Sequence, residues 1–323
     1  MLGGVNQMDV VTLGESMILL TPTQTGPLRY AHTFARRLGG AESNVAIGLS
    51  RLGKKVGWIS KVGDDEFGEY IIATIRGEGV DTTAVKHDSE APTGLYIKEL
   101  RTPHQVRVSY YRQGSAASKL TPEDLDETYI SRAKILHVTG ITPALSETCH
   151  QTTEHAFNIA KRHKLIISFD PNIRLKLWRA EEARPVLRHY ISRSDIVLPG
   201  LEEGELLYNE TDPKRLANTI LETGPSVCVV KLGAAGAYFA TKTGDNGFVP
   251  GLKFKHIVDP VGAGDGFAAG LLCGYLEEKT WHEAVELGNK VGGIVTQYAG
   301  DMEGLPTKKE LLAVEKDEQD VTR

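Results

Sequence analysis

Late in the chain, a glycine-rich turn carries a single acidic side chain, in the stretch IVDPVGAGDGFAAG over residues 257–270. Gly262, Ala263 and Gly264 let the backbone turn sharply and approach a ligand, and the small residues after Asp265 are typical of a closely packed helix. Free N–H groups at the start of a helix, together with its dipole, attract anions. A carboxylate would repel a bound anion. Asp265 is therefore better explained as a proton acceptor for a hydroxyl that attacks a phosphate than as an N-cap.

Two other glycine turns could approach a ligand. Lys231, Gly233 and Gly236 lie between two strand-like runs and would form the second wall of a nucleotide site, although a plain hairpin gives the same pattern. Gly39 and Gly40 precede a helical run, from which Asn44 could reach the hydroxyls of a ligand.

Two arginines stand at the ends of predicted strands. Arg174 follows the turn Asp170-Pro171-Asn172, where parallel sheets bind ligands, and its guanidinium could hold a carboxylate or a phosphate. Arg112 follows Tyr110 and Tyr111, a combination suited to an anionic, hydroxylated molecule. The alternatives are a surface salt bridge for Arg174 and a solvated edge strand for the tyrosines and Arg112.

Two further nucleotide-binding patterns are incomplete. Gly264, Gly266 and Ala269 fit the G-x-G-x-x-A pattern of dinucleotide-binding folds, but two predicted helices and no strand follow. The run from Gly48 to Lys54 resembles a Walker A loop, but it lacks the Ser or Thr and begins inside a predicted helix. Phosphoryl transfer at Asp265 is the interpretation we favour over both.

Alternating strands and helices must position these residues. Such a pattern runs from about residue 131 to residue 231 and predicts an α/β fold with a mainly parallel central sheet flanked by helices. Two hairpins, in insertions at about 17–36 and 90–115, would form a small β-sheet lid over the site. We expect one domain over residues 8–314, followed by a charged tail over 315–323.

Composition argues against several classes of protein. The net charge of −5 is unfavourable for a nucleic-acid partner, and no apolar run is long enough for a membrane span. The first residues, MLGGVNQMDV, lack the pattern of a signal peptide. Cys149, Cys228 and Cys273 are odd in number and far apart, which favours reduced, buried cysteines in a cytoplasmic protein.

The motifs together resemble those of the ribokinase (PfkB) family of carbohydrate kinases. Residues 259–265, DPVGAGD, are similar to its D-T-x-G-A-G-D signature, and G-G-A-x-x-N from Gly39 to Asn44 is similar to its N-terminal signature. The resemblance extends from about Val10 to Leu305. It implies an ATP-dependent sugar kinase with a Rossmann-like core and a β-lid. Asp265 would be the catalytic base, and the backbone amides of Ala263, Gly264 and Asp265 would form an anion hole.

The resemblance also implies cofactor sites. The residues that fall where the family binds ATP are Lys231, Gly233, Gly236, Gly262, Ala263, Gly264 and Asn289, with Asn289 at the adenine. Mg²⁺ would arrive with ATP. The family's N-x-x-E motif for magnesium and phosphate appears here with Gly200 in place of Asn, so that only Glu203 of the motif is kept. Many members also bind a monovalent cation such as K⁺, and Ile257 and Asp259 stand where its ligands are expected.

Three stretches narrow the resemblance: GLY at 94–96, YYRQGSAAS at 110–118 and DPNIRLKLW at 170–178. Within the family they are most similar to those of kinases of 2-keto-3-deoxygluconate, a substrate that would be phosphorylated on its C6 hydroxyl. The resemblance implies substrate contacts from a set that spans the chain: Gly39, Gly40, Asn44, Tyr96, Tyr110, Arg112, Arg174 and Asp265. This substrate is a carboxylate, for which Arg112 and Arg174 would supply positive charge. A fructokinase or another sugar kinase is the alternative enzyme, and a sugar or nucleotide sensor is the alternative outside catalysis. Exposed lid strands could also pair two copies of the chain into a homo-oligomer.

Overall fold

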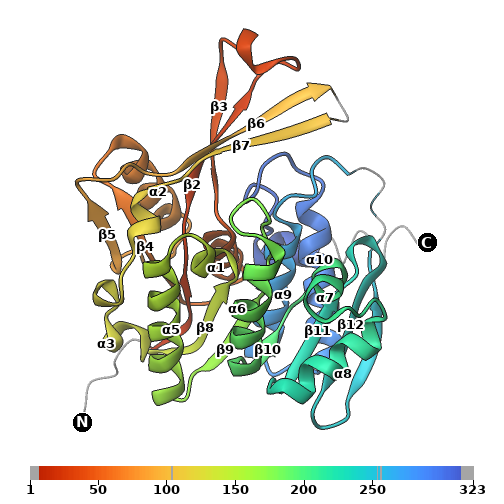
Figure 1. Cartoon of the computed structure of the whole chain (residues 1–323). Helices are drawn as coiled ribbons and strands as arrows, with labels where there is room; N and C mark the ends of the chain where they lie inside the picture. Colours follow the sequence, from red (N-terminus) through yellow and green to blue (C-terminus); the bar gives the residue numbers. More distant parts are fainter. Residues whose placement is uncertain (1–6, 103–104, 253, 255–256, 314–323) are drawn as a thin grey trace.

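Two sheets organise the part of the chain that the computed structural model describes, namely residues 7–102, 105–252, 254 and 257–313 (Figure 1). The tail predicted over 315–323 lies outside these residues. The central sheet has nine strands, which follow one another in space as β13 (Asn246–Pro250), β12 (Gly236–Thr241), β11 (Val227–Lys231), β10 (Ile196–Val197), β9 (Ile166–Asp170), β8 (Ala133–Thr139), β1 (Met8–Leu13), β4 (Val56–Gly63) and β5 (Val85–Asp88).

This sheet is parallel from β11 to β5, and the hairpin of β12 and β13 adds an antiparallel edge. Alternate side chains of a strand enter different cores. In β11, Val227 and Val229 belong to one apolar cluster, whereas Cys228 and Val230 belong to the other. A strand buried on both faces reads as a continuous apolar run, which is why the sequence predicts this strand so closely.

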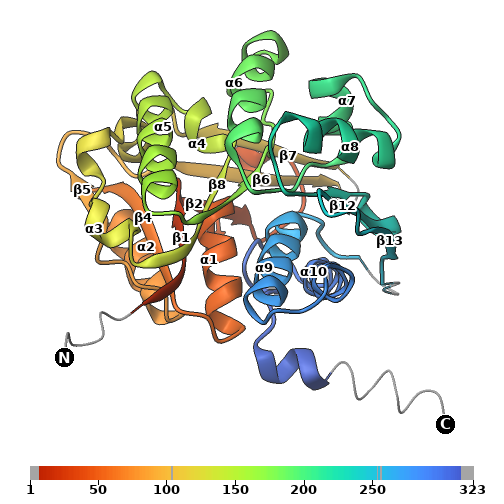
Figure 2. The same ribbon diagram turned by 90° about the horizontal axis from the view of Figure 1, so that it is seen from below.

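Helices cover both faces of the central sheet (Figure 2). Each cluster is closed by apolar helix residues at i, i+3 and i+4 spacing, such as Ile71, Ile72 and Ile75. One face carries α1 (Ala41–Arg51), α2 (Glu66–Gly77), α9 (Ala263–Leu276) and α10 (Trp281–Val295). The other carries α3 (Glu127–Ile130), α4 (Ile141–Ala144), α5 (Glu147–Arg162), α6 (Ala180–Arg193), α7 (Leu201–Tyr208) and α8 (Pro213–Thr223).

Side-chain caps fix several helix starts. Asp65 accepts hydrogen bonds from the amides of Phe67 and Gly68 at the start of α2, and Ser146 accepts one from Cys149 at the start of α5. Thr280 forms a capping box with Glu283 at the start of α10.

The second sheet forms the lid and stands above the carboxyl ends of the central strands (Figure 1). Its strands lie in the order β3 (Phe34–Gly39), β2 (Met17–Pro22), β6 (Leu95–Thr102) and β7 (Gln105–Tyr111). Two hairpins therefore build it, as the sequence predicts, and β3 continues to Gly39, three residues beyond the predicted insertion. Because β3 runs directly into α1, the lid and the Gly39-Gly40 turn form one continuous segment.

None of the helices in the described ranges is long and apolar enough to cross a membrane.

Candidate active site

Two neighbouring cavities meet at the start of α9. The first has a volume of about 410 Å³, lies beneath the lid and contains Asp265 in its wall. The second has a volume of about 610 Å³ and lies between the β12–β13 hairpin and helices α9 and α10. Both are lined by Lys231, Pro260 and Gly264. A phosphoryl group at this junction would therefore be within reach of molecules bound in either cavity.

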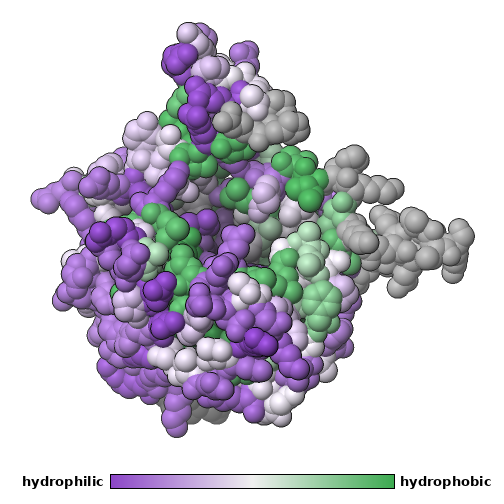
Figure 3. Space-filling view, turned by 45° about the vertical axis from the view of Figure 1, so that its right-hand side comes forward, coloured by the Kyte–Doolittle hydropathy of each residue, from purple (hydrophilic) through white to green (hydrophobic). Residues whose placement is uncertain are grey.

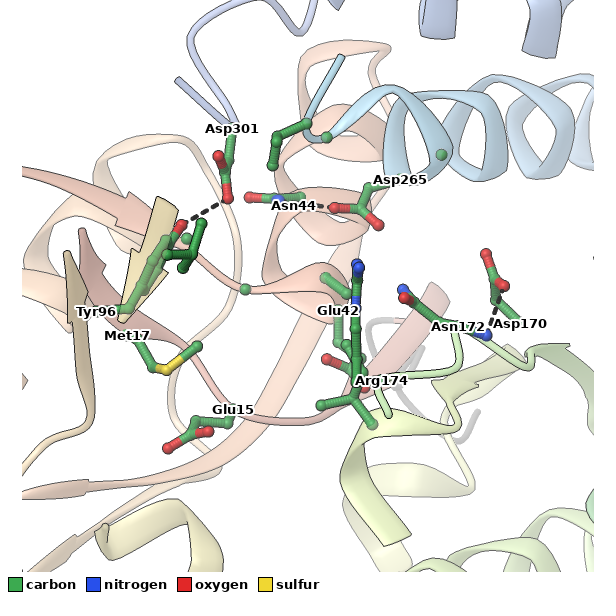
Figure 4. Close-up of a pocket in the computed structure, with 18 of the residues that line it drawn as sticks. Glu15, Met17, Glu42, Asn44, Tyr96, Asp170, Asn172, Arg174, Asp265 and Asp301 are labelled. Atoms are coloured by element: carbon green, nitrogen blue, oxygen red, sulfur yellow. Dashed lines mark hydrogen bonds between the residues drawn. The ribbon is translucent and has the colours of Figure 1, made fainter. Parts of the chain in front are cut away.

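Asp265 lies deep in the first cavity, in the first turn of α9 (Figure 4). Its Oδ2 atom accepts a hydrogen bond of 2.8 Å from the Nδ2 amide of Asn44, which projects from α1. Burial, helped by the neighbouring Asp170 and Asp301, raises the pKa of Asp265 to about 8, against the lowering effects of Asn44 and Arg174. A carboxyl group whose pKa lies near neutrality is suited to accept a proton during catalysis.

The backbone at the start of α9 explains the glycine turn. Gly262, and not Asp265, is the N-cap, with φ of 82°, and a Cβ there would lie 2.4 Å from the carbonyl oxygen of Asp301. The amides of Gly264 and Asp265 meet no acceptor among the described residues, so they can bind an anion. The third predicted amide, of Ala263, donates a 3.3 Å hydrogen bond to Pro260 and is less available than expected.

Tyr96 and Asp301 form the lid-side wall of the first cavity (Figure 4). The Tyr96 hydroxyl donates a 2.7 Å hydrogen bond to Oδ2 of Asp301, and its ring stacks on Tyr110 at 5.5 Å between centroids. A Cβ on Gly39 would lie 1.9 Å from the Tyr96 hydroxyl, so this turn needs glycine for close packing. Oδ1 of Asp301 and Oδ1 of Asn44 are buried and have no partner in the described part of the chain. Both oxygens can accept hydrogen bonds from the hydroxyls of a ligand.

Arg112 lines the first cavity, but its charge is already balanced. Its Nε atom donates a 2.7 Å hydrogen bond to Glu15, a buried residue two positions after the end of β1, and Nη2 contacts the same carboxylate. Ser115 donates to the other oxygen of Glu15 at 2.5 Å. The positive charge predicted for substrate binding at Arg112 is therefore shared with Glu15, and its contact with a ligand stays a prediction.

Arg174 is the cation on this wall without a carboxylate partner. Its side chain points from the loop after β9 toward Asn44 and Asp265, and it makes no hydrogen bond or ion pair with any residue that the structure describes (Figure 4). The other cations of the wall are paired: Arg112 with Glu15, Lys231 with Asp170 and Lys98 with Asp259. A ligand carboxylate would therefore meet Arg174 first.

Of the residues predicted to bind a nucleotide, all but Gly262, which lines the first cavity, line the second: Lys231, Gly233, Gly236, Ala263, Gly264 and Asn289. Lys231 donates a 2.5 Å hydrogen bond to Asp170 and lies beside the start of α9, where a phosphate would be bound. The side-chain amide of Asn289 donates to the carbonyls of Val249 and Pro250, at 3.1 and 3.2 Å. Asn289 thus stabilises the cavity wall, and its contact with adenine stays a prediction.

Glu203, the residue predicted for Mg²⁺, lies at the edge of the first cavity. One of its oxygens accepts a 2.6 Å hydrogen bond from the amide of Gly200, and the other accepts a 2.7 Å bond from the amide of Ile173. Burial raises its pKa, against the effect of Lys231. Within the described ranges no group of three or more His, Cys, Asp or Glu side chains could hold a metal ion. A metal at this junction would therefore depend on ligands that a nucleotide brings.

Of the two residues predicted for a monovalent cation, Asp259 is already engaged in hydrogen bonds, and Ile257 could offer only its backbone carbonyl. The Ile257 side chain is exposed on the rim of the second cavity, so only its carbonyl could act as a ligand. One oxygen of Asp259 accepts a hydrogen bond from Lys98 and the other accepts one from the amide of Val261 at 3.1 Å.

Three residues of the site have no place in the sequence motifs: Glu15, Lys98 and Asp301. Glu15 lies just after β1, and the sequence does not reveal its partner Arg112, which is 97 residues away. Asp301 follows Gly300 in a loop that carries no recognised pattern. Lys98 lies in β6, and no sequence pattern distinguishes it from the other residues of that strand.

Comparison with known proteins assigns the architecture. The model of the PfkB family of carbohydrate kinases matches residues 7–308. The 2-dehydro-3-deoxygluconokinase of Bacillus subtilis (strain 168) is 43% identical over 310 residues, 95% of this chain and 95% of the relative. The crystal structure of a PfkB protein from Polaromonas sp. JS666 is 41% identical, with a TM-score of 0.88 and coverage of 95% of this chain and 99% of that one.

A structure with bound nucleotide shows the same arrangement. This E. coli protein, provisionally assigned as a ribokinase II and solved in complex with ATP and Mg²⁺, is 26% identical, with a TM-score of 0.89. The match covers 96% of this chain and 99% of that one.

Proposed function

The chain belongs to the PfkB family of carbohydrate kinases, and from this premise we propose that it transfers the γ-phosphate of ATP to the C6 hydroxyl of 2-keto-3-deoxy-D-gluconate, giving 2-keto-3-deoxy-6-phosphogluconate. This substrate is the 2-dehydro-3-deoxygluconate in the name of the Bacillus subtilis relative. The observation that carries the proposal is the pairing of charges in the first cavity. It leaves one cation, Arg174, for a sugar that ends in a carboxylate.

The sugar acid is expected to occupy the first cavity in one orientation. Its carboxylate binds Arg174, and its hydroxyls donate to the unpartnered oxygens of Asn44 and Asp301. The terminal C6 hydroxyl then lies at Asp265, which takes its proton as the oxygen attacks the γ-phosphate. The stacked rings of Tyr96 and Tyr110 cover the sugar and exclude water.

ATP is expected to bind in the second cavity, with its base between the β12–β13 hairpin and α10 and its phosphates directed to α9. The amides of Gly264 and Asp265, together with Lys231, stabilise the negative charge that develops on the transferred group. Mg²⁺ would neutralise charge on the phosphates, and most of its ligands would be phosphate oxygens and water, with Glu203 nearby.

A panel of acceptors tests the substrate. Initial rates with MgATP are measured for 2-keto-3-deoxygluconate, its galactonate-derived epimer, fructose, ribose and a nucleoside. We expect the highest kcat/KM for a 2-keto-3-deoxy sugar acid and a loss of orders of magnitude in the Asp265→Asn variant. Preference for fructose over every acid would instead make the chain a fructokinase, and binding without turnover would make it a sensor.

We also propose that the lid pairs with the lid of a second copy. Its strands expose large apolar side chains, among them Tyr111, which is 60% exposed, and Val106, which is 49% exposed. The space-filling view shows apolar residues beneath the tip of the lid, at the edge of the hollow that it covers (Figure 3). Analytical ultracentrifugation should give a dimer for the wild type and a shift toward monomer for Tyr111→Asp. A monomeric wild type at micromolar concentration would contradict the pairing.

Cys149, Cys228 and Cys273 are free and buried, which supports our proposal that the protein works in the reducing cytoplasm.

A further inference from the structure

A lysine from the lid contacts the loop that leads into α9. Lys98 lies in β6, and its side chain turns inward so that the residue is only 5% exposed. Its ammonium donates to Oδ2 of Asp259, whose side chain is 13% exposed. A lysine is rarely buried without a carboxylate, and Asp259 is the carboxylate that this one contacts.

Asp259 in turn holds the turn before the anion site. Its Oδ1 atom accepts the amide of Val261 at 3.1 Å, and its own amide donates to the carbonyl of Thr296 at 3.1 Å. The next residue, Pro260, accepts the amide of Ala263 through its carbonyl. Asp259 therefore fixes the path of the chain into Gly262 and the free amides of α9, and Lys98 fixes Asp259.

These contacts fill the place expected for a monovalent cation. Both oxygens of the Asp259 carboxylate have a donor, and the Thr296 carbonyl already accepts two amides, those of Val258 and Asp259. We propose that the Lys98 ammonium takes the role of that cation, so that the lid itself orders the anion-binding turn and the enzyme needs no K⁺. The role is one of positioning, and it rests on the proposed kinase function.

Charge in the cavity supports this role. Lys98 lines the first cavity close to Asp301, and its charge lowers the pKa of that carboxyl, whereas Asp259 raises it. Removing the ammonium would leave Asp259 without a counterion next to a phosphate site. A monovalent cation from solution could then enter, because Asp259 Oδ2 would be free to bind it.

The experiment compares three proteins in three salts. Wild type, Lys98→Met and the control Arg101→Met are studied in KCl, NH₄Cl and tetramethylammonium chloride at equal ionic strength. The control removes a partly exposed cation, paired with Glu99, from the same strand. Thermal unfolding is recorded without substrate, and initial rates are recorded with MgATP and 2-keto-3-deoxygluconate.

Wild type and Arg101→Met should have the same melting temperature and the same kcat in all three salts. Lys98→Met should lose about 100-fold in kcat in tetramethylammonium, with little change in the KM of the sugar acid, because a misplaced anion site affects the transition state most. K⁺ or NH₄⁺ should raise the kcat of Lys98→Met at least about tenfold above its value in tetramethylammonium. These ions should also raise the melting temperature of this variant, but not those of the other two proteins.

Three results would overturn the proposal: a wild type that needs K⁺, a Lys98→Met variant with wild-type kcat, or a loss that neither small cation restores. The unfolding measurements separate this proposal from the kinase function. If the sugar acid is not the substrate, no protein turns it over in any salt. The selective stabilisation of Lys98→Met by K⁺ or NH₄⁺ would still appear.

Discussion

Single residues in the first cavity differ in whether their charge is already balanced. Arg112 and Arg174 look equivalent in the sequence, since each follows a strand and each could hold a carboxylate. In the structure Arg112 is held by Glu15, whereas Arg174 contacts no carboxylate in the described part of the chain. The two arginines should therefore respond differently to the same substitution.

Arg174→Ala should lower kcat/KM for the sugar acid by about 100-fold, because a charged contact to the substrate is lost in the cavity. Its melting temperature should stay close to that of the wild type. Steady-state kinetics and thermal unfolding measure both effects. Arg179→Ala, five residues along on an exposed helix end, is the matched control and should leave both unchanged. An Arg174 variant with normal KM would show that the carboxylate binds elsewhere.

Arg112→Ala should mainly reduce stability. It leaves the buried carboxylate of Glu15 without its partner, which costs about 3–5 kcal/mol in the free energy of unfolding. Denaturant titration measures this loss, and the double variant Glu15→Gln with Arg112→Met should recover most of it because no charge is then left unpaired. If Arg112→Ala unfolds like the wild type, the ion pair does not form in solution.

Helices and strands position these residues, and the order of these elements along the chain can largely be predicted from the sequence. Strands and helices alternate over the predicted stretch from about residue 131 to residue 231, because buried parallel strands and amphipathic helices have distinct periods. The motif residues also gather as predicted, since the carboxyl ends of parallel strands share one edge.

Contacts between distant elements could not be predicted. Glu15 and Arg112 are 97 residues apart, and Lys98 and Asp259 are 161 apart. Each pair depends on how the lid sits over the central sheet, and no local pattern encodes that geometry. For the same reason the sequence did not reveal Asp301, whose role depends on its contact with Tyr96 in the lid.

The start of α9 depends on one backbone conformation. Gly262→Ala places a Cβ at φ of 82° and 2.4 Å from the Asp301 carbonyl, so the turn must shift. We expect kcat to fall by about 100-fold. Gly53→Ala is the control, since Gly53 has φ of 87° but open space around its Cα, and it should cost stability without affecting kcat. Steady-state assays of both variants decide between a local effect and a general loss of stability.

Burial of the functional carboxyl groups of Asp265 and Asp301 lowers the stability of the whole molecule. Burial raises the pKa of Asp265 from 3.8 to about 8 and that of Asp301 from 3.8 to about 6. The native state therefore keeps protons that the unfolded chain releases, and its stability falls as the pH rises from about 4 to about 8. Above that range the penalty is fully present.

Asp265→Asn should remove part of this penalty. The variant should unfold at a temperature about 2 °C or more above that of the wild type at pH 8, and the difference should shrink toward pH 4, where Asp265 is protonated in both states. Thermal unfolding across this pH range measures the trend. A variant that is less stable than the wild type at pH 8 would show that the Asp265 carboxylate is stabilised in the native state.

The identity of the phosphorylated product tests the central claim most directly. Wild-type protein is incubated with MgATP and 2-keto-3-deoxygluconate, and the product is assigned by ³¹P and ¹³C nuclear magnetic resonance. Our proposal predicts a single new phosphate ester on C6, with one ADP formed per ester and no product from Asp265→Asn. A phosphate on another carbon, or ATP consumed without any sugar phosphate, would contradict it.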